Sequence, residues 1–340
     1  MLDHRSAAMF PGARLSRISP VRSPCFSLSA SIPAKSALSS TAMFSVLTWN
    51  IQSARSPAGG ADLDGVLACI DRFAPDADVL CLQEVACGFR ARDGSPGGDQ
   101  FAGLARRLPD WPCASAWAVD TLAPNGSRRR LGSMVFSRRP IIQVLRHSLP
   151  WPADAVPSMP RVVLELTLDT PLGRLRLLNA QLEVFSERQR LAQVEALRAL
   201  QREAWSHARQ PRSDAGPGGD PDSPFAFVPR PAPALLLGDF NMLPGSGSHQ
   251  ALLAPFEDHK RDDSRENTPP WRDAWALAHP GRPHAPTVGL HDPGGAPFTF
   301  DYAFVSADLA PRVRGLQVGD VRLGEMASGS DHQPLLLELG

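Results

Sequence analysis

A short apolar run that ends in polar residues constrains this chain most. The run is Ala234-Leu235-Leu236-Leu237, and Gly-Asp-Phe-Asn follows it at 238–241. Four apolar residues between a Pro-rich segment and a Gly/Pro/Ser segment predict a buried strand. Side chains alternate along a strand, so Asp239 and Asn241 fall on one face at its end. Asp and Asn also favour strand ends because they form turns, so this motif alone does not separate a site from a plain turn.

Five further apolar segments carry polar residues in the same way. Each segment predicts a strand, and a buried amide or carboxylate is costly unless it has a partner. One such residue is commonly a satisfied core group, but six segments with this feature predict that the side chains converge on one polar site. The residues are Asn50 in 46–52, Glu84 in 78–85, Asn179 and Gln181 in 175–184, Asp301 in 298–306, and Asp331 and His332 in 330–339.

In chain order the motifs TWN, LQE, NAQLE, GDFN, FDY and SDHQP resemble those of the endonuclease/exonuclease/phosphatase superfamily of divalent-metal phosphoesterases. The resemblance covers residues 44–340, and GDFN and SDHQP carry most of its specificity. Segments 273–292 and 300–313 further resemble uncharacterised bacterial members. The resemblance implies an α/β fold, a four-layer α/β/β/α sandwich of two packed mixed sheets with a metal site at one end.

The acidic residues predict a site for a hard cation. Hydrolysis of a phosphate ester needs such a cation on a non-bridging oxygen and a base for the attacking water. Mg²⁺ (or Mn²⁺) binds one or two carboxylates and keeps several waters. Glu84 and Asp331 supply those carboxylates, with Asn50 as an adjacent oxygen ligand or a water anchor.

Four other residues are expected to carry out the catalytic steps. Asp239 is the predicted general base, and Asn241 holds it or the phosphate in place. Asp301 beside His332 favours the imidazolium, which stabilises the phosphate during the reaction. The resemblance implies the same roles at the matching positions.

One position departs from the superfamily pattern, because Gln181 stands where NTHLE has a histidine. An amide donates a hydrogen bond to a phosphate oxygen but cannot pass a proton at neutral pH. Two functions follow. One is a divalent-metal phosphoesterase, a hydrolase that cleaves phosphodiesters with an Asp-activated water. The alternative is a catalytically weakened binding module on the same fold. The otherwise intact motif set favours the enzyme.

The first 43 residues differ from the rest of the chain. They contain five basic residues and one acidic residue, many Ser, Ala and Pro, and no apolar periodicity. Such a segment is typical of a transit-type leader, a solvated tail, or a disordered or mis-assigned extension. We favour the extension over 1–43, with one catalytic domain over 44–340. We therefore expect a cytoplasmic protein, or an organelle-targeted one if the segment is a genuine transit peptide.

Charge restricts the partners. The whole chain has a formal net charge of zero, so residues 44–340 carry −4. Proteins that grip duplex DNA usually show a basic surplus, so a processive duplex nuclease is not expected. Nucleic acid, a phospholipid headgroup and a small phosphodiester all fit as substrates. No apolar window reaches the ~18 residues of a membrane span. The five cysteines form no CxxC pair and predict reduced thiols, and we expect a monomer.

Apolar periodicity also predicts the elements that position these motifs. The strands expected between 113 and 147 should form one meander. Segment 211–233 predicts a long exposed loop. Segment 256–298 predicts a second irregular stretch, with a short helix near Trp271 and Trp275 that caps the site. We expect His279, His284 and His291 on the loop surface, with His284 and His291 also flanking the rim of the site. The expected strands are 44–51, 78–83, 113–120, 131–137, 141–147, 161–168 and 174–182, and the expected helices are 61–73, 100–108 and 187–208.

Overall fold

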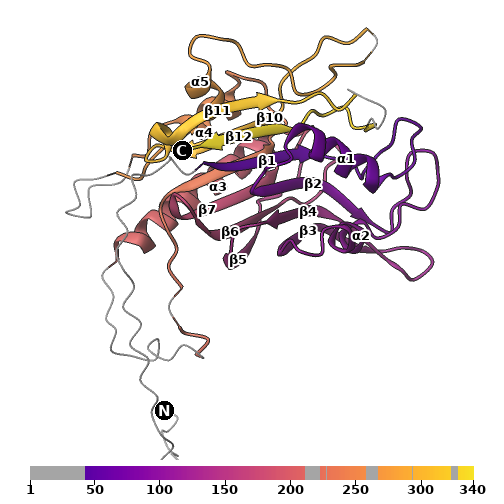
Figure 1. The fold of residues 1–340 in the computed structure, drawn as a ribbon, viewed down its shortest axis with the longest axis horizontal. Helices are drawn as coiled ribbons and strands as arrows, with labels where there is room; N and C mark the ends of the chain where they lie inside the picture. Colours follow the sequence, from indigo (N-terminus) through magenta and orange to yellow (C-terminus); the bar gives the residue numbers. More distant parts are fainter. Residues whose placement is uncertain (1–42, 211–222, 227, 258–266, 293, 323–327) are drawn as a thin grey trace, which may run out of the picture. The chain divides into compact units, whose positions relative to one another are not determined.

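Two six-stranded sheets form the core of the computed structural model, which describes residues 43–210, 223–226, 228–257, 267–292, 294–322 and 328–340. The first sheet has the order β11-β12-β1-β2-β4-β3 and the second has the order β5-β6-β7-β8-β10-β9. Figure 1 shows β1 beside β12, from opposite ends of the described chain. The strands of the first sheet are β1 (Phe44–Asn50), β2 (Val79–Cys87), β3 (Cys113–Leu122), β4 (Arg128–Ser137), β11 (Val313–Val318) and β12 (Leu335–Leu339). Those of the second are β5 (Ile141–Ser148), β6 (Val162–Thr170), β7 (Gly173–Gln181), β8 (Ala234–Asp239), β9 (Trp271–Asp273) and β10 (Asp301–Ser306).

Helices cover the outer faces of both sheets. One apolar cluster joins the first sheet to the helices α1 and α2, and another joins the second sheet to α3 and α4. A third cluster lies between the sheets. The predicted four-layer α/β/β/α sandwich is therefore confirmed. The helices are α1 (Leu63–Phe73), α2 (Gln100–Arg107), α3 (Glu187–Arg209), α4 (Gly247–Leu253), α5 (Ala274–Ala278) and the 3₁₀ turn η2 (Ala310–Arg312).

Strand alternation decides which side chains face the space between the sheets. In β1, Phe44 and Val46 belong to the cluster between the sheets, whereas Leu47 and Trp49 pack under the helices. This period of two is the ordinary geometry of a strand. It places Asn50, the last residue of β1, on the inner face, where the amide is fully buried.

The expected meander at 113–147 is wrong in one respect. Strands β3 and β4 do form an antiparallel hairpin in the first sheet, but β5 begins the second sheet and pairs with β6. The chain crosses between the sheets at Arg139-Pro140, where proline lacks the N–H that a continuing ladder needs. The short helix near Trp275 is present as α5, while Trp271 lies in β9.

Several predictions fall on parts of the chain outside the described residues. These are the N-terminal extension, apart from Met43, and parts of the irregular stretches 211–233 and 256–298. In the described segments, no helix combines the length and apolar character needed to cross a bilayer.

Candidate active site

Three neighbouring strand ends of the second sheet bring polar residues together. Gln181 on β7 is the register partner of Asp239 on β8, and Asp239 is the partner of Asp301 on β10. Directly opposed residues on adjacent strands lie about 5 Å apart, so their side chains can interact. The sheet thus places one amide and two carboxylates side by side at the ends of three neighbouring strands.

Asp239 lies at the centre of this row and is almost fully buried. Its Oδ2 accepts hydrogen bonds from Asn50 Nδ2 (3.1 Å), Asn241 Nδ2 (3.2 Å) and Gln181 Nε2 (3.3 Å), and its Oδ1 accepts one from the Asn241 N–H (3.0 Å). Burial raises the pKa of the Asp239 carboxyl, and the charge on His332 opposes this rise without cancelling it. A fixed carboxylate with a raised pKa can accept a proton from water.

Glu84 reaches the site through a break in its strand. The pairing of β2 with β4 shifts register between Leu82 and Val85, and Glu84 adopts a left-handed backbone with φ 55°. Such a conformation is uncommon outside glycine and concentrates at functional sites. The Glu84 Oε1 atom accepts hydrogen bonds from Gln181 Nε2 (2.6 Å) and Asn50 Nδ2 (3.0 Å). Two amides therefore connect this carboxylate to that of Asp239.

The loop before β12 brings the last two predicted residues. Trp49 donates from Nε1 to the His332 carbonyl oxygen (3.0 Å), and the Asp331 N–H donates to Gln52 Oε1 (3.1 Å). Both contacts fix the loop to the end of β1. One end of the first sheet thus meets one end of the second at the site.

His332 is held as a cation. Its Nδ1 lies 2.9 Å from Asp301 Oδ2, and its Nε2 lies 3.7 Å from Asp331 Oδ1. Burial lowers the pKa of His332, but the carboxylates of Asp301, Asp239 and Asp331 have a larger and opposite effect. The pKa of His332 is therefore raised to about 10. Ligand atoms of Asp239, Asp301 and His332 lie within 4.8 Å of one another, a spacing that a metal could bridge. An imidazolium has no free lone pair, however, so the charged His332 cannot ligate a metal.

Glu84 and Asp331 have carboxylate oxygens left for a cation. Asp331 Oδ1 is buried and has no hydrogen-bond partner in the described part of the chain, and Glu84 uses only Oε1 for its amide contacts. Carboxylate oxygens of this kind suit a hard cation. Asn50 turns Nδ2 toward the carboxylates, while its Oδ1 accepts from the Gln52 N–H (3.0 Å). In this orientation Asn50 aligns the carboxylates, and it would ligate a cation only after its amide rotates.

Asn179, one of the polar strand residues, does not contact the group around Asp239. Its Oδ1 accepts from Gln83 Nε2 (2.7 Å), and its Nδ2 donates to the Leu82 carbonyl oxygen (3.2 Å). These buried contacts join β7 of one sheet to β2 of the other. Asn179 therefore fixes the spacing of the sheets beneath the site.

The structure contains a second polar cluster that the sequence did not predict. Asp273 Oδ2 lies 3.1 Å from His249 Nε2 and 2.7 Å from His284 Nε2, so His284 is not the free surface residue that was expected. Burial raises the pKa of the Asp273 carboxyl, but the hydrogen bonds from His249 and His284 outweigh this effect. The pKa of Asp273 is therefore lowered to about 2. These ligand atoms also lie within 4.8 Å of one another. The Gly245 N–H donates to His249 Nδ1 (3.3 Å), so Nε2 carries the proton toward Asp273 and the cluster is a structural clamp. Asp273 directly before an apolar helical turn is a helix-capping signal that could have indicated part of it.

The comparison with protein families agrees with this geometry. Residues 47–332 match the model of the Endonuclease/Exonuclease/phosphatase family, and this range includes every residue of the site. The chain belongs to this family, whose fold is that of hydrolytic phosphoesterases. No curated protein matches the sequence.

Solved structures share the fold at low sequence identity. An endonuclease/exonuclease/phosphatase from Beutenbergia cavernae is 22% identical with a TM-score of 0.55, and the match covers 88% of this chain and 71% of that one. A mannosyl-6-phosphatase from Bacteroides thetaiotaomicron is 16% identical with a TM-score of 0.56, over 87% of this chain and 99% of that one. Truncated TDP2 from Caenorhabditis elegans is 17% identical with a TM-score of 0.51, over 87% and 97%.

Proposed function

We propose that this protein hydrolyses phosphodiesters with a divalent cation, Mg²⁺ or Mn²⁺, and that Asp239 is the base for the attacking water. One observation carries the proposal. Asn50 and Gln181 each donate hydrogen bonds to both Glu84 and Asp239. The same two amides therefore orient the carboxylate suited to a cation and the carboxylate suited to a base, as a single catalytic unit requires.

A bound cation, held by Glu84 and Asp331 with Asn50 beside them, would draw charge from a non-bridging phosphate oxygen. The remaining steps belong to side chains. Asp239 takes the proton of the attacking water while Asn241 fixes both of its oxygens in position. His332, kept cationic by Asp301, stabilises the negative charge that develops on phosphorus-bound oxygens.

Three broader features complete the proposal. The site spans Asn50 to His332, which supports one catalytic domain over 44–340 with residues 1–43 as an extension. An odd number of cysteines without CxxC spacing supports a reducing, cytoplasmic location. We propose a monomer that acts on a nucleic acid, a phospholipid headgroup or a small phosphodiester.

Turnover of bis-(p-nitrophenyl) phosphate tests the base. Asp239→Asn should cut the rate by at least ~10³-fold, because an amide cannot accept the proton of water. Asp169→Asn is the matched control, because Asp169 is exposed on β6. Its register partner is Arg174, near the start of β7, whereas Gln181 is the last residue of that strand. A rate above about a tenth of wild type in Asp239→Asn would exclude Asp239 as the base.

The cation is tested in the same assay. Glu84→Gln should lower the rate, and raised Mg²⁺ should partly restore it, because one of few charged ligands is lost. Full wild-type activity in excess EDTA would remove the cation from the proposal. Absence of turnover with either metal, across nucleotide, lipid and small phosphodiester substrates, would favour the weakened binding module instead.

A further inference from the structure

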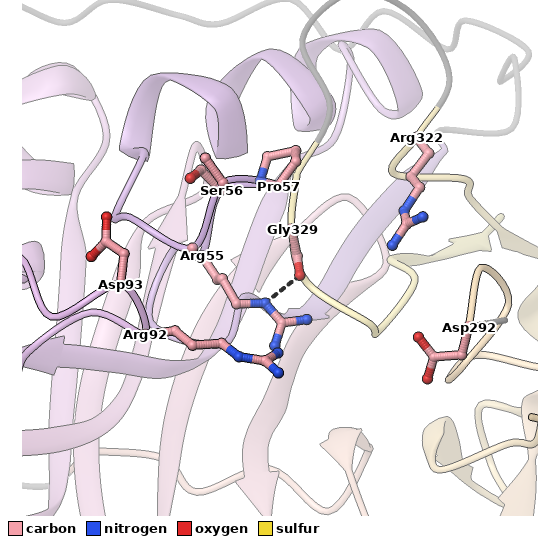
Figure 2. Close-up of a pocket in the computed structure, with 10 residues that line it drawn as sticks. Arg55, Ser56, Pro57, Arg92, Asp93, Asp292, Arg322 and Gly329 are labelled. Carbon is pink, nitrogen blue, oxygen red and sulfur yellow. Dashed lines mark hydrogen bonds between the residues drawn. The ribbon is translucent and has the colours of Figure 1, made fainter.

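Two hollows share part of their lining, and Glu84 lines one of them. The first has a volume of about 320 Å³, and its lining includes Glu84, Gln52, Arg55, Gly59 and Arg92. The second has a volume of about 600 Å³ and shares Arg55, Gly59 and Arg92 with the first. Because three residues line both, the larger hollow, shown in Figure 2, adjoins the one that Glu84 lines.

Positive charge dominates the larger hollow. Arg55, Arg92 and Arg322 line it from three separate loops, and Figure 2 shows the three side chains around the hollow. The two acidic residues in its wall are Asp93 and Asp292. Asp93 is turned away in Figure 2, and its Oδ1 accepts from Ser95 N (2.9 Å) and Oγ (2.6 Å).

Arg92 and Arg322 differ from other arginines near strand ends. In the described ranges, neither guanidinium has a hydrogen bond, ion pair or aromatic contact. By contrast, Arg128 lies 2.8 Å from Asp120 and Arg139 lies 2.7 Å from Asp78. The wall holds three arginines against two aspartates, and a bound anion offsets the repulsion between the like charges.

Arg55 links the hollow to the catalytic loop. Its Nε donates to the Gly329 carbonyl oxygen, and its own carbonyl oxygen accepts from the Gly329 N–H (2.7 Å). A Cβ on residue 329 would overlap the carbonyl oxygen of Ser56, so only glycine permits this close approach. Gly329 lies two residues before Asp331, so an anion beside Arg55 has a fixed position relative to the proposed metal site.

We propose that this hollow is a subsite for a second phosphate group, carried on the same molecule as the ester that is cleaved. The inference rests on the proposed function in placing the cleaved ester beside Glu84. Planar guanidinium groups bind phosphate oxygens in pairs, and the three arginines outnumber the two aspartates in the wall. The substrate class is thus a molecule with two phosphates, either a neighbouring phosphodiester of a nucleic acid strand or a second phosphate on a small molecule.

Binding to the full chain in EDTA tests the subsite without turnover. Isothermal titration calorimetry should give a Kd for thymidine 3′,5′-bisphosphate at least about tenfold lower than for thymidine 5′-phosphate. Arg92→Ala and Arg322→Ala should each remove most of this advantage, whereas Arg92→Lys should keep part of it. Arg55 is left intact because its loss would also disturb the loop of Asp331. Arg174→Ala is the matched control, since Arg174 is exposed near the far end of β7.

The outcomes separate clearly. Equal Kd values for the two nucleotides, or an equal loss in Arg174→Ala, would overturn the subsite, because net charge alone would then explain binding. A similar advantage for a 5′-phosphorylated thymidine dinucleotide supports a nucleic acid strand as the source, and an advantage confined to the bisphosphate supports a small molecule.

A turnover arm distinguishes this inference from the proposed function. The substrates are the p-nitrophenyl ester of thymidine 5′-phosphate with and without a 3′-phosphate, and kcat/KM should be higher with it. If neither ester is cleaved with Mg²⁺ or Mn²⁺ while the binding advantage persists, the subsite stands and the proposed function fails. If both esters are cleaved equally and bind equally, the proposed function stands and the subsite fails.

Discussion

Gln181 shows how one side chain can serve two carboxylates. Its Nε2 lies 2.6 Å from Glu84 Oε1 and 3.3 Å from Asp239 Oδ2, so both amide protons face acidic groups. A neutral histidine at this position carries a single ring proton and could donate to only one of them. The departure from the superfamily pattern therefore places a double donor at the centre of the site.

Gln181→Glu tests this role with a side chain of the same shape. The variant loses both charged hydrogen bonds and adds a third carboxylate beside Asp239, so kcat should fall roughly 10–100-fold or more. The acid limb of the pH–rate profile should also move to higher pH, because a like charge raises the pKa of the base further. A rate within threefold of wild type, with an unmoved acid limb, would show that these contacts are not used.

Strands β7 and β8 must approach closely for the site to form. Gly238 has φ 138°, and a Cβ there would overlap the carbonyl oxygen of Ala180 on the neighbouring strand. The register partners Gln181 and Asp239 follow immediately after this point. The glycine of the GDFN motif is therefore needed for packing, in addition to any effect on the turn.

Gly238→Ala should lower the free energy of unfolding by roughly 2–4 kcal/mol, since the strands must separate and the backbone is strained. Urea denaturation measures this change. Gly173→Ala is the matched control, because Gly173 also has a positive φ (92°) but open space around its Cβ position, so it should cost only about 1 kcal/mol. Equal losses in the two variants would mean that backbone conformation, and not close approach, sets the cost at Gly238.

Asp273 caps the start of α5 and contacts His249 on α4 and His284 after α5. This clamp therefore joins α4 and the segment after α5 to the start of α5. The folded pKa of Asp273, about 2, lies below the ordinary value of an aspartate. Its ionised form therefore stabilises the fold at pH values above about 4, and this contribution is lost as the pH falls toward 2.

The expected consequence is a pH-dependent cost for Asp273→Asn. The variant should lose about 1 kcal/mol more unfolding free energy at pH 5 than at pH 3, because part of the wild-type advantage has already gone at pH 3. Urea denaturation of both proteins at each pH measures the difference. Asp169→Asn, which alters an exposed carboxylate, should cost nearly the same at both values. A cost for Asp273→Asn that does not change with pH would contradict the lowered pKa.

Across the whole molecule, the sequence predicted the residues that lie at strand ends and missed those that depend on long-range packing. Asp239 and Asp301 were predictable because short apolar runs mark their strands. The crossing of β5 into the second sheet and the clamp at Asp273 depend on contacts between distant segments. The same holds for the hollow lined by Arg55, Arg92 and Arg322, because three loops far apart in the chain form it and none has a local motif.

The proposed boundary at Met43 is testable on the intact fold. A chain that begins at Met43 should keep the melting temperature and the turnover of the full sequence. Strand β1 begins at Phe44, whose side chain is fully buried between the sheets, and the sequence of residues 1–42 has no apolar periodicity that would form a docking face. Thermal unfolding and hydrolysis of bis-(p-nitrophenyl) phosphate measure both properties.

A chain that begins at Val46 is the matched control for this truncation. It lacks Phe44, the register partner of Leu339, and so loses a buried aromatic side chain at the edge of the cluster between the sheets. Such a loss costs about 3–5 kcal/mol, which should lower the melting temperature by roughly 5–15 °C. If the melting temperature of the chain that begins at Met43 fell by as much as that of this control, residues 1–42 would have to pack on the catalytic domain. The boundary would then move toward the N-terminus.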